Sequence, residues 1–468
     1  MTQTEESEMT IENDLGRDDI KKLVWRIAIP SMMAQFVSVL YSIVDRMYIG
    51  NIPEAGTFAL AGAGVCGPVV TMIGSVAFWV GIGGSPLMSM SLGQGNAKRA
   101  KQILANSFLL LAVASVLLML LVYPFREPML RFFGASDTTL PYADTYFSIY
   151  LSGTFFALMA TGMNQFITSQ GFAKIGMYSV MLGAVLNIIL DPVFIFLLNM
   201  GVAGAALATI LSQMASCIFV LSFLFGKRAI VRITFGNYNM RLMGRILVLG
   251  FTPFIIIAMD NVMIITMNSI LQTYGGPQEG DMLTTCATIV QSFMLVITMP
   301  LGGITGGTQT ILAFNYGAGK NDRVKSAQKY IFLLGGIYTL ILFILARTSG
   351  SLFVRLFTSD AALAAESVRL IRVYTLAVVP LSIQYEIVDG FTGLGMVHLS
   401  LPLSFFRKGV YFLALFILPY LGEARSVFYA EPISDIISPA VSIVIYVIAM
   451  RKYFNRIKQV PCFNCQKQ

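Results

Sequence analysis

Two carboxylic acids lie inside long apolar stretches of this chain, where ionised side chains are rare. Asp45 lies late in one such stretch and Asp191 lies in another, and a charge at the centre of a spanning helix costs about 2.5 to 3.5 kcal/mol on insertion scales. Asn187 precedes Asp191 by four residues, so both side chains would project from one helix face. Tyr146 and Asn164 are 18 residues apart, about five helical turns, and would also share a face. These five groups predict a single polar site.

The chemistry of this group suits a small cation. Carboxylate, amide and phenol oxygens are hard ligands of the kind that Na⁺ prefers, and carboxylates in apolar surroundings can exchange protons near neutral pH. The group therefore predicts an ion-coupling site for H⁺ or Na⁺, without choosing between them. Structural alternatives stay open: Asp45 could pair with Arg46, Tyr146 could belong to an interfacial aromatic belt, Asp191-Pro192 could end a helix, and the asparagines could only bridge helices.

The second half of the chain carries its acids at other places. Asp45 aligns there with the neutral Asn268, whereas Asp260 lies deep in an apolar stretch. Glu386 and Asp389 are three residues apart and would share a helix face. These three acids are candidates for binding a cationic substrate or a second coupling ion. The alternative for Asp389 is a place at the cytoplasmic end of its helix.

Composition indicates that membrane-spanning helices position these residues. The 468 residues are 56% hydrophobic and 12% charged, with a mean hydropathy of +0.74, whereas soluble domains are about 25% charged. An apolar helix of about 20 residues crosses the hydrocarbon core. The sequence predicts twelve such spans, at residues 23–49, 59–90, 103–123, 141–166, 174–197, 202–225, 243–272, 283–314, 328–346, 365–391, 399–420 and 427–450.

The basic residues predict how the spans are oriented. Roughly three-quarters of the 32 Lys and Arg residues fall in segments on the same side as both termini, Arg407 and Lys408 being counted there as a loop. This bias predicts a multi-pass protein of the plasma membrane with both termini in the cytoplasm. It also explains the net charge of +8, so no nucleic-acid partner is expected.

The two halves of the chain resemble each other at a nearly constant offset, with matching short motifs in the same order. The repeat predicts two six-helix lobes inserted with the same orientation, a plan typical of transporters that rock one lobe against the other. The matching pairs are Pro30 with Pro253, Gly83-Gly84-Ser85 with Gly306-Gly307-Thr308, Gly93–Lys101 with Gly317–Lys325, Leu130–Phe133 with Val354–Phe357, and Thr168–Gly171 with Thr392–Gly395. The predicted parts are a tail at 1–22, an N-terminal lobe at 23–225, a cytoplasmic linker at 226–242, a C-terminal lobe at 243–450 and a tail at 451–468.

Several motifs in the chain match one family of transporters. They are Ile29-Pro30, Asp45-Arg46-Met47-Tyr48-Ile49-Gly50, Gly93-x-Gly95-Asn96-Ala97 with its repeat, and Asn187-Ile188-Ile189-Leu190-Asp191-Pro192 followed by Gly201-x-x-Gly204-Ala205-Ala206. On these motifs the chain, from about residue 20 to 455, resembles the multidrug and toxic compound extrusion (MATE) family. It resembles the bacterial branch that places its essential acids in the N-terminal lobe.

The resemblance implies an all-α secondary active antiporter that exports cationic, amphipathic drugs or toxic compounds while H⁺ or Na⁺ moves inward. It implies a functional monomer in the lipid bilayer, without a cofactor beyond the coupling ion, and a first span that bends at Pro30. Asp260 lies near the acid that other branches carry in span seven, whereas Glu386 and Asp389 match no family pattern. The implied ion-site residues are Asp45, Tyr146, Asn164, Asn187 and Asp191.

Two other classes of function are alternatives to the drug antiporter. A lipid-linked oligosaccharide flippase of the same superfamily would need basic residues in its cavity, and only Arg369, Arg372 and Arg407 could serve. A membrane-embedded enzyme or receptor is disfavoured, because the chain has a single histidine and none of the H-E-x-x-H, G-x-S-x-G or P-loop motifs. Cys462 and Cys465 form a lone C-x-x-C pair, which predicts a reduced cytosolic tail rather than a metal site.

Overall fold

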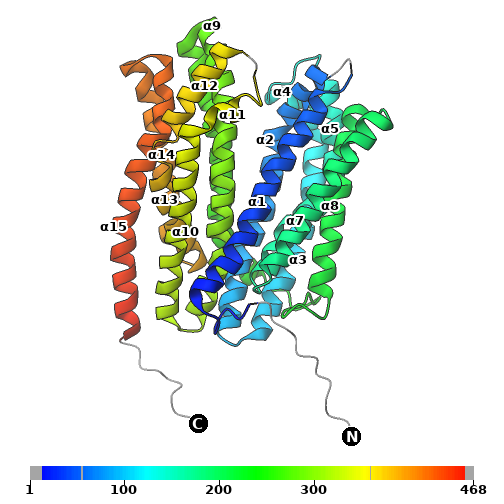
Figure 1. The fold of residues 1–468 in the computed structure, drawn as a ribbon. Coiled ribbons are helices and arrows are strands. Elements are labelled where there is room, and N and C mark those ends of the chain that lie inside the picture. The colour runs from blue at the N-terminus through cyan, green and yellow to red at the C-terminus, as the bar shows by residue number, and fades with distance from the viewer. Residues whose placement is uncertain (1–12, 54–55, 359, 459–468) are drawn as a thin grey trace, which may run out of the picture. The chain divides into compact units, whose positions relative to one another are not determined.

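The computed structural model describes residues 13–53, 56–358 and 360–458, and all the regular secondary structure in this part is helical (Figure 1). The first half contains α1 (Ile20–Gly50), α2 (Gly56–Gly93), α3 (Ala97–Val122), α4 (Arg126–Phe132), α5 (Leu140–Ser152), α6 (Thr154–Thr168), α7 (Ala173–Pro192) and α8 (Gly201–Phe225). The second half contains α9 (Met240–Gly317), α10 (Asn321–Thr348), α11 (Gly350–Val354), α12 (Ala361–Tyr374), α13 (Val378–Gly393), α14 (Val397–Leu421) and α15 (Ala430–Lys458). Short helical turns are η1 (Tyr123–Phe125), η2 (Val193–Leu197) and η3 (Ala424–Tyr429).

Ten segments of the described chain are long and apolar enough to span a membrane. Two of them are parts of α9, which is broken at Gly276, where φ is 67° and a glycine is favoured. The predicted fourth and tenth spans are absent from the ten because each is divided into two shorter helices, at Gly153 and at residues 375–377. With these interrupted spans counted, the twelve predicted crossings and the all-α fold class are confirmed.

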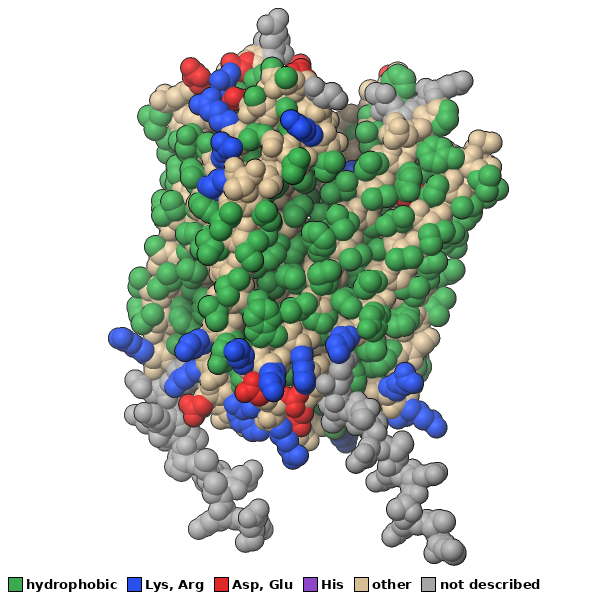
Figure 2. All heavy atoms as spheres, in the orientation of Figure 1, with side chains coloured by type: hydrophobic (Ala, Val, Ile, Leu, Met, Phe, Trp, Pro, Cys, Tyr) green, Lys and Arg blue, Asp and Glu red, His purple; other side chains and the backbone are tan. Residues whose placement is uncertain are grey.

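The surface agrees with a lipid environment. On the face shown in Figure 2, hydrophobic side chains cover the middle of the helices, and most Lys and Arg side chains gather towards the helix ends. Leu120, Leu197, Val248 and Leu413 are among the large apolar residues that are exposed. Such a broad apolar surface is unfavourable in water and is expected where hydrocarbon is the solvent.

The chain divides into two compact units that do not simply follow the sequence repeat. The first unit runs to Val262 and includes Leu295–Gly319 and Thr392–Val397. The second contains Met263–Met294, Lys320–Phe391 and the residues from His398 onwards. The end of α9 therefore packs with the first unit, although it belongs to the second sequence repeat. The lobe boundaries given by the repeat stay a prediction.

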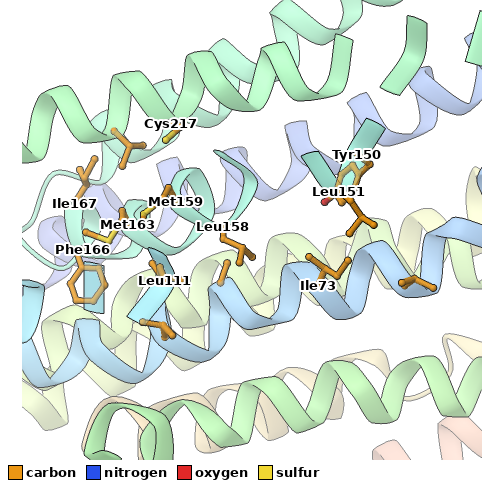
Figure 3. Close-up of a cluster of buried hydrophobic side chains, with 14 of the residues drawn as sticks. Ile73, Leu111, Tyr150, Leu151, Leu158, Met159, Met163, Phe166, Ile167 and Cys217 are labelled. Atoms are coloured by element: carbon orange, nitrogen blue, oxygen red, sulfur yellow. The ribbon is translucent and has the colours of Figure 1, made fainter. Parts of the chain in front are cut away.

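Apolar packing holds the helices of the first unit together. α2 packs against α3 and α6, α7 packs against α8, and α1 lies against α7. Figure 3 shows part of the resulting core, in which Ile73 of α2, Leu111 of α3 and Phe166 of α6 are buried. Small residues permit the closest approach: a Cβ on Gly81 would lie 2.9 Å from the carbonyl oxygen of Gly162.

A second close approach joins the two sequence repeats within the first unit. A Cβ on Gly93 of α2 would collide with the carbonyl oxygen of Phe314, and a Cβ on Gly317 would collide with that of Met90. The contacts are reciprocal, because each carbonyl lies three residues before the glycine of its own helix. Gly93 and Gly317 are also counterparts in the repeat. This is the self-complementary contact expected on a pseudo-two-fold axis.

Candidate ion-coupling site

The contact between α1 and α7 brings the two predicted acids of the first half together. The carboxyl groups of Asp45 and Asp191 lie within hydrogen-bonding reach of each other. Asn187 Nδ2 donates to Asp191 Oδ1 at 3.1 Å, as the four-residue spacing on one helix predicts. Asp191 and Asn187 are buried, and Asp45 is half-buried, whereas its alternative partner Arg46 is exposed.

Tyr146 joins this group, but Asn164 does not lie beside it. Tyr146 is buried in α5 and is in electrostatic contact with Asp45. Asn164 belongs to α6, because the span is interrupted at Gly153, so the two residues are not on one continuous helix. Asn164 Nδ2 donates to the Gly176 carbonyl oxygen at 3.3 Å. Gly176 precedes Asn187 by eleven residues, about 16 Å along α7. A role for Asn164 in the ion site stays a prediction.

Three polar residues at this site were missed by the sequence analysis. Tyr41 of α1 is in electrostatic contact with both acids. Tyr150 stacks its ring on that of Tyr146 with centroids 6.5 Å apart, and its hydroxyl lies near the side chain of Gln213 of α8. Tyr41 lies four residues before Asp45, and Tyr150 lies four residues after Tyr146. This helical spacing was the signal that could have found both tyrosines.

The site contains buried oxygens that need a proton or a cation. Among the described residues, Asp45 Oδ1, Asn187 Oδ1 and Asp191 Oδ2 have no hydrogen-bond partner. A buried acceptor without a donor costs about 1 to 3 kcal/mol, and more if it is charged. A proton bound by one carboxyl group, or a Na⁺ ion held by carboxylate and amide oxygens, would satisfy these atoms. The donor set therefore fits either coupling ion.

The acids of the second half do not gather in the same way. Asp260 is half-buried in α9 and belongs to the first compact unit. Glu386 of α13 is only 5% exposed, and among the described residues neither of its carboxyl oxygens has a hydrogen-bond partner. Asp389 is half-buried and in electrostatic contact with Glu386, as the spacing of three residues predicts. Glu386 and Asp389 belong to the second unit.

The second unit contains a buried ion-pair network that the sequence analysis did not foresee. Arg407 Nη2 donates to Glu431 Oε1 at 2.6 Å, and Arg407 Nε donates to Asp435 Oδ1 at 2.9 Å. The three side chains are 9%, 8% and 1% exposed. Tyr374 donates to the other oxygen of Glu431 at 3.4 Å. We call these four residues the arginine network.

The arginine network corrects one detail of the predicted topology. Arg407 and Lys408 were assigned to a cytoplasmic loop, which is wrong: both are buried near the middle of α14. Two adjacent basic residues in an apolar stretch are typical of a membrane interface, but here the charge of Arg407 is compensated by acids of α15. The four-residue spacing of Glu431 and Asp435 was the signal for a charged helix face.

The arginine network occupies the second-repeat counterpart of uncharged positions. At the offset that pairs Gly93 with Gly317, Tyr374 is the counterpart of Tyr150, and Arg407 is the counterpart of Gly183. The residues Ser212-Gln213-x-x-Ser216 of α8 share their polar spacing with Ser434-Asp435-x-x-Ser438 of α15. Divergence between the repeats has thus placed two acids, on α1 and α7, in one half and a buried ion-pair network around Arg407 in the other.

Two bacterial multidrug export proteins are similar to this chain over about three-quarters of its length. The multidrug export protein MepA of Staphylococcus aureus (strain N315) is 24% identical over 351 residues, which are 74% of this chain and 76% of the relative. MepA of Staphylococcus saprophyticus is 23% identical over 361 residues, which are 76% and 78% of the two chains.

Solved structures share the fold. An outward-facing multidrug resistance MATE family transporter of the MOP superfamily is 23% identical, with a TM-score of 0.88 over 97% of this chain and 100% of the other. A MATE protein crystallised in a straight conformation is 24% identical, with a TM-score of 0.87 over 95% and 98% of the two chains. The same TM-score and coverage, at 23% identity, hold for a MATE protein in a bent conformation.

The family model named MatE matches this chain in two segments, residues 30–193 and 255–417. The two segments are related by almost the same offset as the paired motifs, so each sequence repeat is matched once. Together they cover more than half of the 468 residues. The chain therefore belongs to the MatE family.

Proposed function

We propose that this protein is a secondary active antiporter that exports cationic, amphipathic drugs or toxic organic compounds as H⁺ or Na⁺ moves inward. The observation that carries the proposal is the pairing of Asp45 and Asp191 across α1 and α7, with buried oxygens that need a cation. The relatives named multidrug export proteins support the substrate class. The protein acts as a monomer in the plasma membrane, with both termini in the cytoplasm.

The proposed cycle starts from electrostatics at this pair. When both carboxyl groups are ionised, they repel each other across the contact between α1 and α7. A proton or Na⁺ that enters removes the repulsion, so the two helices favour a different packing in the ion-loaded state. Because α1 is part of the first unit, a new packing of α1 against α7 would change the space that this unit offers to a bound substrate. Each ligand thereby disfavours the state that the other needs, which is the basis of exchange.

Pro30 is proposed as the hinge through which α1 responds. It is buried in the N-terminal half of α1 and has no N–H to donate to the carbonyl oxygen of Arg26. The next residue is held closely: a Cβ on Gly303 of α9 would lie 2.6 Å from the carbonyl oxygen of Ser31. A helix that is anchored beside a missing hydrogen bond has a defined place to bend.

The Pro30→Ala variant tests this hinge. Alanine restores the missing backbone donor and stiffens α1, so turnover should fall roughly tenfold while the ion site stays intact. Ethidium efflux from proteoliposomes measures the rate. The matched control is Pro402→Ala, which changes an exposed proline inside α14 and should leave efflux unchanged. Equal rates for Pro30→Ala and the wild type would remove the hinge from the mechanism.

Glu386 and Asp389 are proposed to attract the cationic part of the substrate in the second unit, and Asp260 is a further candidate in the first. The support is the burial of Glu386 with both carboxyl oxygens available. A buried acid that no described group satisfies favours a cationic partner. Drugs of this class carry a positive charge on an apolar body, and one or two acids in an apolar wall would recognise it.

The function is tested with purified protein in liposomes that contain ethidium. The proton gradient and the Na⁺ gradient are imposed separately, and dye movement is followed by fluorescence. We expect efflux with only one of the gradients, which also identifies the coupling ion. Liposomes without protein control for passive leakage. If ethidium and a second cationic dye move under neither gradient, drug export is contradicted, and lipid flipping becomes the activity to assay.

A further inference from the structure

A basic cavity lies in the first unit where α3 and α9 begin. Its volume is about 410 Å³, and four of the residues that line it are cationic. Lys98 and Arg99 come from the first turn of α3, and Arg241 and Arg245 come from the start of α9. None of the described residues that line the cavity is acidic. These four side chains are called the basic pocket below.

The cations of the basic pocket are not neutralised by nearby acids. Within the part of the chain that the structure describes, none of the four forms an ion pair within 4.0 Å. This differs from the buried Arg407, which contacts two carboxylates. Like charges that converge on a cavity repel one another and raise the free energy of the folded protein. An anion in the cavity would reverse this effect.

Two helix N-termini add to the positive potential. Asn96 caps α3, where its side chain accepts from the backbone N–H of Arg99 at 2.9 Å, and Asn239 caps α9 in the same way with Arg241 at 2.9 Å. Both caps line the cavity. Helix N-termini carry a partial positive charge and offer backbone donors, which suits phosphate groups. The two helix dipoles therefore add to the positive potential that the four side chains create in the cavity.

The start of α10 is the second-repeat counterpart of the start of α3, and its charges differ. Lys98 aligns with Asp322, at the start of α10. Asp322 lies 4.0 Å from Lys325, so this helix start carries its own acid and an ion pair. The start of α3 thus lacks the acid that the start of α10 carries, although the neighbouring residues are similar. A general need for basic residues at the cytoplasmic surface would not produce this difference.

The surface of α9 indicates where the pocket lies relative to lipid. Arg241, Arg245 and Val248 follow the spacing of one helix face, and all three are exposed. Val248 is 64% exposed inside a membrane-spanning segment, so this face passes from charged to lipid-facing within two turns. An anion bound at Arg241 and Arg245 is therefore level with lipid headgroups, with room for acyl chains beside Val248.

We propose that the basic pocket binds the phosphate headgroup of an anionic phospholipid from the surrounding membrane. Its four cations and two helix N-termini suit a phosphodiester, and the apolar face of α9 suits the attached chains. The lipid would hold the start of α9 against the start of α3. This inference does not depend on the proposed transport activity, because its test measures binding alone.

Native mass spectrometry of the purified full-length protein with phosphatidylglycerol tests the proposal. The double variant Lys98→Gln/Arg241→Gln should bind this lipid about thirtyfold more weakly, since each Lys or Arg beside anionic headgroups contributes about a factor of five. The matched control is Lys320→Gln/Arg323→Gln, which removes two charges at the start of α10 and should bind as the wild type does. If the first variant does not fold, a second double variant, Arg99→Gln/Arg245→Gln, replaces it in the test. Equal phosphatidylglycerol binding by the wild type and a folded pocket variant overturns the proposal.

Further arms of the experiment identify the source of the anion. Phosphatidylethanolamine, which is zwitterionic, should bind weakly and equally to the wild type and the pocket variants. Glycerol 1-phosphate should not displace phosphatidylglycerol at equal concentration, because it lacks acyl chains. Displacement would assign the pocket to a soluble phosphate instead. A chain without residues 2–12, which are rich in Glu, should bind the lipid as tightly as the full chain. A large gain on this deletion would assign the pocket to that segment.

Discussion

The Asp191→Asn variant should lose gradient-driven efflux while it accumulates in the membrane at the wild-type level. Asparagine keeps the shape of the side chain and can still bond Asn187, but it cannot take up and release a proton and is a weaker Na⁺ ligand. Asp191 is fully buried beside Asp45, so the substitution leaves a single carboxyl group in a site that we propose needs both. We expect the ethidium efflux rate to fall about a hundredfold or more, measured with a gradient imposed across proteoliposomes.

Further variants separate coupling from binding and folding. Asp45→Asn should behave like Asp191→Asn, and the double variant should be no worse than either, because the two acids act as a unit. Ethidium binding to each detergent-solubilised variant, followed by fluorescence anisotropy, should persist. Asp322→Asn, which changes an exposed acid at the start of α10, serves as the control. Wild-type efflux by Asp191→Asn would refute the proposed ion site.

The Arg407→Ala variant should destabilise the protein by about 3 to 5 kcal/mol, the cost of breaking a buried ion pair by removing one partner. Without Arg407, Glu431 and Asp435 would face each other in a buried site with their charges uncompensated. Thermal unfolding of the purified protein, followed by tryptophan fluorescence, measures the loss. The amount of the variant that accumulates in the membrane gives a second measure of the loss of stability.

The chain provides a matched control and a rescue. Arg425 also contacts two acids, Glu279 at 2.9 Å and Glu366 at 3.7 Å, but Arg425 and Glu279 are about 40% exposed. Arg425→Ala should therefore cost less than about 1 kcal/mol. A neutral triple variant, with Arg407→Met, Glu431→Gln and Asp435→Asn, should recover most of the stability that Arg407→Ala loses. If Arg407→Ala and Arg425→Ala unfold at the same temperature, the arginine network is not a buried electrostatic constraint.

Hydropathy and repetition predicted the spans because lipid demands long apolar helices, but they could not predict where a span is interrupted. Gly153 divides the fourth span without lowering its hydropathy, since glycine is tolerated in apolar helices. The contact that requires a glycine there is tertiary: a Cβ at Gly153 would lie 2.5 Å from Ile210 of α8. The interrupted span also explains why Tyr146 and Asn164, expected on one face, contact different parts of the first unit.

The site was predictable where an unusual residue type carried the signal. Asp45 and Asp191 could be predicted because a carboxylate in a membrane-spanning helix is costly and is therefore usually functional. Asn187 could be predicted from its helical spacing from Asp191. Gln213 was missed because a neutral amide in an apolar helix is common. Arg407 was misplaced because its partners, Glu431 and Asp435, lie on the following helix, and hydropathy does not pair residues across helices.

The reciprocal contact of Gly93 and Gly317 has a consequence for how the two repeats can diverge. Each glycine is fitted against the backbone of the other repeat, so its neighbours cannot take its place. Inserting or deleting one residue in either helix near this contact would move a side chain into a carbonyl oxygen, and no substitution in the partner could make room. After duplication of an ancestral half, side-chain types could change, as the counterparts Gly183 and Arg407 show. The number of residues near this contact could not change, so mutations there are restricted to substitutions, which keep the register of the two helices.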